Sequence, residues 1–345
     1  MILLNSKIDN IDIINIDNEK GLVLTLCTIG ASIYDLKVID KDNKLESVVV
    51  RPNDFQVFCN STGYYGKSIG RFAGRIDKGK CFIDEKEYNI AINWNGVNAL
   101  HGGPDDAISH KVFDYSINKE NEYIDVIFTY KELENYLPGD IDYKITYRVY
   151  DSKNVFNIYF EAIPNKKTII NLTNHAYFNL SGDGKNTVLD HNMMLYCDKY
   201  TRLNNELITI SVDEVNEVMD FTKGKKIKTH IEDSSLQNHT AFGYDHCFIK
   251  ANEKEDIIAV LSDDVSKRKL TVKSSLPTVV CYSNNYVDSQ LKFNVLNEKL
   301  LKYHAITLEC QHIPNGINME NVEKSLFEAN EKYSHYVSYI FEIML

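Results

Sequence analysis

Two groups are best placed for proton transfer, a carboxylate and an imidazole. Each lies in a segment that is expected to be extended and that carries few other charges. Glu309 lies in the segment 306–312. Read with a period of two, this segment places Thr307, Glu309 and Gln311 on one side and Ile306, Leu308 and Cys310 on the other, as in a half-buried strand. Acidic residues are depleted in strand interiors, and a carboxylate taken out of water needs a partner or a task. The alternative is a solvated glutamate on an exposed face.

The imidazole belongs to His175, in the run 169–180. If this run is extended, His175 shares one face with the polar and aromatic residues Asn171, Thr173, Tyr177 and Asn179. Solvated sheet faces usually carry Lys and Glu, and this face carries neither. His175 is the only group on it that titrates near neutral pH. The pattern favours the lining of a cleft for a polar ligand over a merely solvated face.

Three further polar groups lie in predicted loops or at a strand end. His101 precedes Gly102 and Gly103, which permit close backbone approach. Arg75 lies in the Gly-rich segment 70–76, and Asp245 lies at the entry of a probable strand. Taken singly, these residues also suit a structural loop histidine, a surface charge and a turn cap.

Other classes of site fail on spacing. The Gly66-Lys67-Ser68 triplet lacks the first glycine of a phosphate-binding loop, because Ser61 occupies that position. The histidines do not pair at the short spacings of zinc ligands, so we expect no metal site. Cys310 points to the apolar side of its strand and is expected to pack rather than react.

The elements that would position these groups are strands. Runs rich in Tyr, Ile, Val and Phe alternate with Asn, Asp, Gly or Lys turns, and no long helix interrupts them. This pattern favours an antiparallel all-β protein over alternating β and α units. Clear examples of predicted strands are 123–130, 141–150, 154–163, 167–180 and 335–343. Residues 203–238 are polar and poorly periodic, and we expect them to be irregular.

Composition limits the partners. Of the 345 residues, 43 % are apolar and 25 % charged, which is typical of a folded globular protein. The 49 acidic and 38 basic residues give a net charge of −11, which argues against nucleic acid and anionic membranes as partners and allows a neutral small molecule. Seven scattered cysteines without a CxxC pair, and a start without a signal sequence, indicate a cytoplasmic protein. Length alone leaves open one large domain or two smaller ones.

Taken together, the motifs resemble those of the aldose 1-epimerases, the galactose mutarotases. The resemblance rests on Thr62–Gly66 with Gly70–Ile76, Asn98–Gly103, Thr173–Leu180, Gly243–His246 and Leu308–Gln311, in the order of that family. It implies one large antiparallel β-sandwich over residues 1–345, with few short helices and an open cleft for a hexose. It implies no cofactor and no metal, and leaves open whether the protein is a monomer or a homodimer.

The resemblance also assigns roles. Glu309 is implied as general base, His175 as general acid, and Arg75, His101 and Asp245 as contacts to the sugar. Interconversion of sugar anomers requires a base on the anomeric hydroxyl and an acid on the ring oxygen, and the two groups exchange roles when the ring closes again.

Two positions depart from the family pattern. Gly74 stands where the family usually has Asn, and Val280 stands where it has Gln. Each loss of an amide is expected to weaken contacts to particular hydroxyls by about 1 kcal/mol or more, so the preferred sugar is left undefined. Two other functions remain as alternatives: a non-catalytic sugar-binding protein, and a glycoside hydrolase that pairs Glu309 with Asp245.

Overall fold

The protein is described here by a computed structural model that covers residues 1–345 except 105–106, 253 and 288–289. All strand pairs among the described residues are antiparallel, apart from one isolated parallel bridge between Phe72 and Asn171. The described residues form two α-helices, α1 (Phe55–Asn60) and α2 (Ser234–Gln237), and both are short. The predicted all-β class with few short helices is therefore confirmed.

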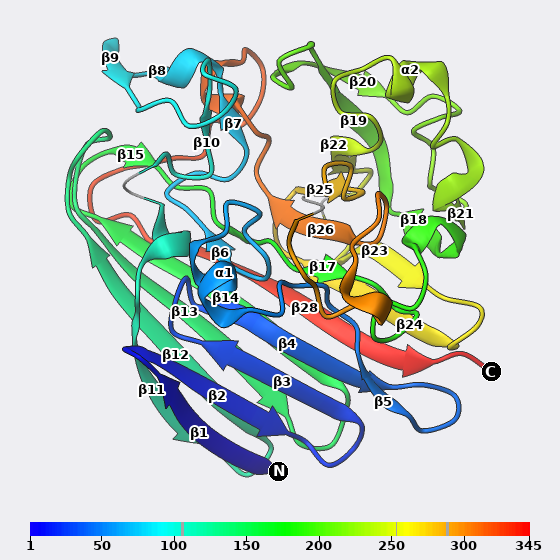
Figure 1. The fold of residues 1–345 in the computed structure, drawn as a ribbon. Helices are drawn as coiled ribbons and strands as arrows, with labels where there is room; N and C mark the ends of the chain where they lie inside the picture. Colours follow the sequence, from blue (N-terminus) through cyan, green and yellow to red (C-terminus); the bar gives the residue numbers. More distant parts are fainter. Residues whose placement is uncertain (105–106, 253, 288–289) are drawn as a thin grey trace.

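Two sheets form the lower part of the molecule in Figure 1. The five-stranded sheet runs in chain order: β1 (Ile2–Ile8), β2 (Ile11–Asp17), β3 (Leu22–Cys27), β4 (Ser32–Ile39) and β5 (Leu45–Ser47). The nine-stranded sheet has the order β11 (Asp114–Lys119), β12 (Tyr123–Glu132), β13 (Ile141–Tyr150), β14 (Val155–Pro164), β28 (Tyr333–Ile343), β24 (Arg268–Ser274), β23 (Ile257–Ser262), β18 (Asn192–Leu195) and β21 (Lys225–Lys226).

A six-stranded sheet lies above the five-stranded sheet in Figure 1, and the β18–β21 end of the nine-stranded sheet reaches its height. The order of the six-stranded sheet is β17 (Tyr177–Phe178), β26 (Ile306–Gln311), β25 (Thr278–Tyr282), β22 (Asp245–Lys250), β19 (Cys197–Leu203) and β20 (Thr209–Glu214). Four two-stranded ladders complete the fold: β6 (Ser68–Ile69) with β16 (Thr173–Asn174), β7 (Arg75–Ile76) with β10 (Ala99–Leu100), β8 (Lys80–Ile83) with β9 (Lys86–Asn89), and β15 (Thr168–Ile169) with β27 (Leu326–Phe327).

The main core lies between these sheets. One continuous cluster of buried apolar side chains takes Leu24 from the five-stranded sheet, Ile145 and Val337 from the nine-stranded sheet, and Leu308 and Cys310 from β26. Burial of such surface is the dominant stabilising term in folding. The seven cysteines are all free thiols and all buried. Within the described residues, no helix has both the length and the apolar character needed to cross a bilayer.

The segment 167–180 differs from its prediction as one long strand. It forms three two-residue pieces, β15, β16 and β17, which pair with β27, β6 and β26 respectively. Each piece thus belongs to a different ladder, and both of its faces are buried. The alternation of polar and apolar residues is real, but the chain changes partner every few residues and cannot continue as one strand.

Candidate active site

One face of the six-stranded sheet forms the floor of a cavity of about 690 Å³. Glu309 on β26 lies opposite Val280 on β25, and Val280 lies opposite Cys247 on β22. Side chains two residues apart share a face, so Thr307 and Gln311 flank Glu309 on its strand, and Gln311 also lines the cavity. The predicted strand around Glu309 is confirmed. Its expected half-burial is wrong, because all six residues of β26 are buried.

His175 reaches the cavity between β16 and β17, close to the end of the floor that β17 forms. Of the predicted polar face, only His175 and Tyr177 line the cavity. Asn171 instead accepts a hydrogen bond from the backbone N–H of His312 (2.8 Å), and Asn179 donates to the carbonyl of His304 (2.6 Å). These two asparagines hold the irregular chain around the site in place.

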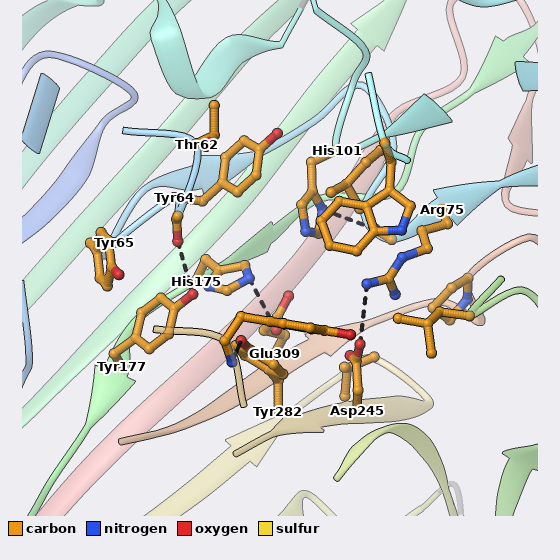
Figure 2. Close-up of a pocket in the computed structure, with 18 of the residues that line it drawn as sticks. Thr62, Tyr64, Tyr65, Arg75, His101, His175, Tyr177, Asp245, Tyr282 and Glu309 are labelled. Carbon is orange, nitrogen blue, oxygen red and sulfur yellow. Dashed lines mark hydrogen bonds and ion pairs between the residues drawn. The ribbon is translucent and has the colours of Figure 1, made fainter. Parts of the chain in front are cut away.

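The opposite wall comes from the β7–β10 ladder, in which Arg75 pairs with Leu100. The next residue along, His101, continues the ladder through its N–H to the carbonyl of Gly74 (3.0 Å). Arg75, His101, His175, Asp245 and Glu309 all line the same cavity (Figure 2). Five residues that are far apart in sequence, each a predicted site residue, are thus brought together.

His175 and Glu309 are in direct contact. The His175 Nε2 atom lies 3.4 Å from Glu309 Oε1, and both side chains are almost completely buried. Thr307 donates a hydrogen bond of 2.8 Å to the same Oε1 atom. This oxygen is therefore held in place by a hydroxyl while it faces the imidazole.

Burial sets the protonation state of this pair. It raises the pKa of Glu309 to about 8, and the nearby charge of Asp245 adds to the effect, while the Thr307 hydrogen bond and Arg75 oppose it. Burial also lowers the pKa of His175 to about 4. Near neutral pH the pair accordingly holds one proton, on Glu309 when no substrate is present.

His101 is set up as a hydrogen-bond donor. Its Nδ1 atom accepts a hydrogen bond from the Gly74 N–H (3.1 Å), and burial lowers the pKa of its imidazole well below the ordinary value. A neutral ring that accepts at Nδ1 carries its proton on Nε2. His101 can therefore donate from Nε2 to an oxygen of a bound ligand.

The same hydrogen bond bears on metal binding. His101, His175 and Glu309 bring their ligand atoms within 4.8 Å of one another, as a metal site of two histidines and one carboxylate would require. A metal-bound histidine, however, normally donates its other ring N–H to an acceptor, whereas Nδ1 of His101 faces the N–H of Gly74. This donor set does not fit a metal ion.

Arg75 and Asp245 form an ion pair beside the acid and base. The Arg75 Nη2 atom lies 3.1 Å from Asp245 Oδ2, and both side chains are mostly buried. The Arg75 guanidinium also lies over the indole ring of Trp94, 4.7 Å from the ring centroid. A paired arginine and aspartate present both donors and acceptors to ligand hydroxyls.

Several site residues were not assigned a role from sequence. Tyr64 packs edge-on against His101 at 4.8 Å, and Tyr177 lies 5.0 Å from His175 while it donates to the carbonyl of Gly63 (2.9 Å). Thr307 could have been found, since it lies two residues before Glu309 on the same strand face. Nothing in the sequence pattern identifies Trp94, which comes from the turn 93–98.

Comparison with known proteins gives the family. The chain matches the family described as Aldose 1-epimerase over residues 12–340. It belongs to the aldose 1-epimerase family. It is 28 % identical over 320 residues to a galactose mutarotase of Sus scrofa, with 91 % of this chain and 89 % of the relative covered.

Two further relatives carry different names. An aldose 1-epimerase of Streptococcus thermophilus is 28 % identical over 347 residues, covering 96 % of this chain and 95 % of the relative. A maltose epimerase of Levilactobacillus brevis is 25 % identical over 327 residues, covering 93 % and 92 %. The solved structure of a galactose 1-epimerase from Lactobacillus acidophilus superposes with a TM-score of 0.85 at 24 % identity, covering 100 % of this chain and 99 % of that one. The chain therefore has the galactose mutarotase-like fold.

The two departures from the family pattern have distinct structural settings. Gly74 has a φ of +78°, and a Cβ atom built there would lie 2.5 Å from Pro314 Cβ. Any side chain at this position, the amide included, would require Pro314 to move. Val280 lies on the cavity floor directly opposite Glu309. An apolar neighbour there contributes to the burial of the Glu309 carboxyl.

Proposed function

We propose that this protein is an aldose 1-epimerase that interconverts the α and β anomers of an aldohexose such as galactose or glucose by acid/base ring opening and reclosure. The observation that carries the proposal is the buried pair itself, with His175 Nε2 and Glu309 Oε1 3.4 Å apart on a cavity wall. Membership of the aldose 1-epimerase family supports the same reaction.

The geometry suits the reaction because both proton transfers occur at one carbon. The anomeric hydroxyl oxygen and the ring oxygen are bonded to the same atom, so an acid and a base in contact with each other can serve both oxygens. The base takes the hydroxyl proton while the acid protonates the ring oxygen, the carbon–oxygen bond of the ring breaks, and a free aldehyde forms. Rotation about the neighbouring carbon–carbon bond and reclosure on the other face give the second anomer.

Glu309 acts as the base and His175 as the acid. The proton that Glu309 holds in the free site passes to His175 across their contact, which leaves a carboxylate beside the anomeric hydroxyl and an imidazolium beside the ring oxygen. The exchange keeps the proton number of the pair constant, so no proton has to enter from solvent. A positioned acid and a positioned base each contribute rate factors of about 10² to 10⁴.

Arg75, His101 and Asp245 hold the sugar. His101 donates from Nε2, and the Arg75–Asp245 pair binds hydroxyls on the part of the ring away from the anomeric carbon. Fixing the ring against the acid and base lowers the entropic part of the barrier. These three residues lie on the β7–β10 ladder and on the six-stranded sheet. Rigid elements of this kind suit the positioning of a substrate.

The decisive test replaces the base. Glu309→Gln should abolish measurable acceleration of α-glucose and α-galactose mutarotation, followed by polarimetry or NMR, because an amide cannot accept the hydroxyl proton. Glu320→Gln, the same change at an exposed site, should keep full activity. Circular dichroism of both variants checks that they are folded. Retained mutarotase activity of Glu309→Gln would contradict the assignment of Glu309 as the general base.

Two outcomes would favour the other functions. Sugar binding by the wild-type protein without acceleration of mutarotation would indicate a non-catalytic sugar-binding protein. Release of the aryl group from an aryl glycoside would indicate a glycoside hydrolase that uses Glu309 and Asp245 as its two carboxylates.

A further inference from the structure

Thr307 on β26 contacts the base from a position outside the cavity. Its side chain is fully buried, and its hydroxyl donates to Glu309 Oε1 at 2.8 Å. Thr307 is not among the residues that line the cavity, whereas Glu309, two residues further along the same strand face, is. A sugar in this cavity would therefore contact Glu309 but not Thr307. Any effect of Thr307 on the reaction must pass through the carboxyl of Glu309.

Two tyrosines stand beside this hydroxyl on the neighbouring strands. Thr307 pairs with Tyr177 on β17 and with Tyr282 on β25, so an aromatic residue lies opposite it on each side. The two rings meet edge-on with their centroids 6.1 Å apart, and each tyrosine hydroxyl bonds to a backbone group of another loop. Among the described residues, Glu309 is thus the only hydrogen-bond partner of the Thr307 hydroxyl. A hydrogen bond in such apolar surroundings is stronger than one exposed to water.

The two carboxyl oxygens of Glu309 have different surroundings. Oε1 accepts from Thr307 and also faces His175 Nε2 at 3.4 Å. Oε2 has no hydrogen-bond partner among the described residues, and yet it is not one of the fully covered polar atoms that lack a partner. It therefore reaches the surface of the cavity that Glu309 lines. One oxygen is committed to contacts within the protein, and the other is left to a ligand.

A carboxyl group has little orientational preference of its own. The terminal torsion of a glutamate side chain is broad and roughly two-fold, so Oε1 and Oε2 exchange places easily unless a neighbour prevents it. Thr307 is suited to prevent it, because a β-branched side chain is itself restricted in its χ1 rotamers. Its strand is also paired on both sides, with β17 and with β25. The hydroxyl therefore addresses one oxygen of Glu309 from a fixed position.

The other titratable groups around this carboxyl come from several elements. They line the same cavity and are Arg75 on β7, His101 after β10, His175 between β16 and β17, Tyr177 on β17, Asp245 and Cys247 on β22, and Tyr282 on β25. The hydrogen bond from Thr307 lowers the pKa of Glu309 more than the charge of Arg75 does, against the larger effect of burial. Without it, burial and the charge of Asp245 would raise this pKa further.

We propose that Thr307 is a positioning residue for the base: its hydroxyl commits Oε1 of Glu309 to the contact with His175, so that Oε2 takes the proton of the anomeric hydroxyl. This inference rests on the proposed epimerase function, because it assigns that reaction to single atoms. The proton that Glu309 holds at first leaves Oε1 for His175 Nε2 and goes on to the ring oxygen. The anomeric O–H bond breaks, and its proton passes to Oε2. The total charge of the acid and base is the same before and after ring opening.

The kinetic test removes the hydroxyl and then restores it. Thr307→Val keeps the shape of the side chain and should lower kcat for glucose and galactose mutarotation about tenfold, because a hydrogen bond to a charged group is lost. KM should stay unchanged, since Thr307 does not line the cavity. The pH above which kcat/KM falls should rise by about one unit, because the carboxylate becomes less stable. Thr307→Ser restores a hydroxyl and should return both quantities toward the wild type.

Thr278→Val is the matched control. It removes another buried hydroxyl, on the neighbouring strand β25, which donates to the carbonyl of Gln311 (2.6 Å) and not to Glu309. This variant should keep the wild-type kcat and pH profile. Thr307→Ala replaces Thr307→Val in the comparison if the valine variant does not fold. A wild-type kcat and an unmoved pH profile after loss of the Thr307 hydroxyl would overturn the proposal.

A titration without sugar separates this inference from the proposed function. Carboxyl ¹³C NMR with labelled glutamate identifies Glu309 by the signal that is lost in Glu309→Gln. Its pKa should be higher in Thr307→Val than in the wild type. An unchanged pKa in a protein that accelerates mutarotation would overturn the role of Thr307 alone. A raised pKa in a protein whose wild type does not accelerate mutarotation would overturn the epimerase function alone.

Discussion

Glu309 shows how a single environment converts an ordinary acidic side chain into one that is protonated near neutral pH. Its carboxyl is almost completely buried, faces a neutral imidazole, and has Val280 directly opposite on the neighbouring strand. These surroundings disfavour the carboxylate in the free protein. In the proposed reaction, the anomeric hydroxyl of the sugar would add a second hydrogen bond to the one that Thr307 donates to this carboxyl.

The proposed reaction should depend on pH through this pair. The active form holds one proton, so kcat/KM should fall above about pH 8, where Glu309 loses its proton and none remains for the ring oxygen. The value of kcat/KM should also fall below about pH 4. There His175 is protonated as well as Glu309, so the pair holds two protons and no base remains. Polarimetry across pH 3 to 10 measures both limbs, once the buffer-catalysed rate has been subtracted. An alkaline limb at the ordinary carboxyl pKa would contradict the role of burial.

Substitution of Val280 should shift the pH above which kcat/KM falls, here called the alkaline limb of the pH profile. Val280→Gln places an amide donor opposite Glu309, where cross-strand side chains lie about 4.5–5.5 Å apart. A hydrogen bond to the carboxylate stabilises its ionised form, so the pKa of Glu309, and with it the alkaline limb of kcat/KM, should move below about 8. Val280→Leu keeps an apolar neighbour and should leave the limb in place. Equal limbs in the two variants would show that Val280 does not set this pKa.

At the scale of elements, the β7–β10 ladder is the part that aligns the cavity wall carrying Arg75 and His101. Gly74, just before β7, both accepts from the backbone N–H of His101 and donates to its imidazole. The positive φ of Gly74 makes this double link possible, since it turns the chain beneath Pro314 at a distance that excludes a Cβ atom. The orientation of His101 thus depends on the backbone of a residue that has no side chain.

Gly74→Ala should therefore destabilise the protein and weaken sugar binding together. Left-handed backbone strain costs about 1–3 kcal/mol, and the clash with Pro314 adds to it. Gly96→Ala is the matched control, because Gly96 has a similar φ of +66° but open space around its Cβ position. Urea denaturation should show a greater loss for Gly74→Ala than for Gly96→Ala, and only Gly74→Ala should raise KM. Similar behaviour of the two variants would mean that strain alone matters.

Sequence pattern predicted the regular strands well and the irregular ones poorly. The prediction of 141–150 coincides with β13, whose long alternation reflects its place inside a large sheet. The run 167–180 alternates equally well, but its three pieces join three ladders, and a period of two carries no information about partners. Residues 203–238, expected to be irregular, contain β20, an edge strand whose mixed exposure hides its alternation.

The candidate site was predictable only in part, for a related reason. The residue types and their motif order suggested Glu309, His175, Arg75, His101 and Asp245, and the structure places all five in one cavity. Their mutual distances, the tautomer of His101 and the shared proton depend on burial and on contacts between distant segments. Trp94 and Leu207 could not be singled out, because a turn residue becomes a cavity wall only through the segments packed around it.

At the scale of the whole molecule, Arg268 ties the two large sheets together. This arginine on β24 is fully buried, and it donates to the carbonyls of Val38 (3.1 Å) and Leu180 (3.1 Å) and pairs with Glu46 at 3.0 Å. Its partners belong to the five-stranded sheet and to the segment that leads away from β17. A buried cation of this kind is fully compensated only when every contact is present.

Arg268→Met should lower the free energy of unfolding by about 3–5 kcal/mol, since it leaves carbonyls and Glu46 without their buried partner. KM for the sugar should stay unchanged, because Arg268 is not among the residues that line the cavity. Urea denaturation and polarimetry measure the two quantities. Lys269→Met, a change to the next and more exposed side chain, should alter stability far less. A raised KM in Arg268→Met would show that the link between sheets also shapes the site.

The position of β28 in the nine-stranded sheet has a consequence for the order of folding. This strand follows all other strands in sequence, yet it lies between β14 and β24 and makes eight register pairs with the first and seven with the second. Until β28 is in place, the nine-stranded sheet exists only as two separate halves. During synthesis on the ribosome, strands β11 to β14 are therefore made before β28, and β14 has an unpaired edge in the meantime. An unpaired strand edge is prone to pairing with other chains. The nine-stranded sheet becomes continuous only after this last strand has closed the gap.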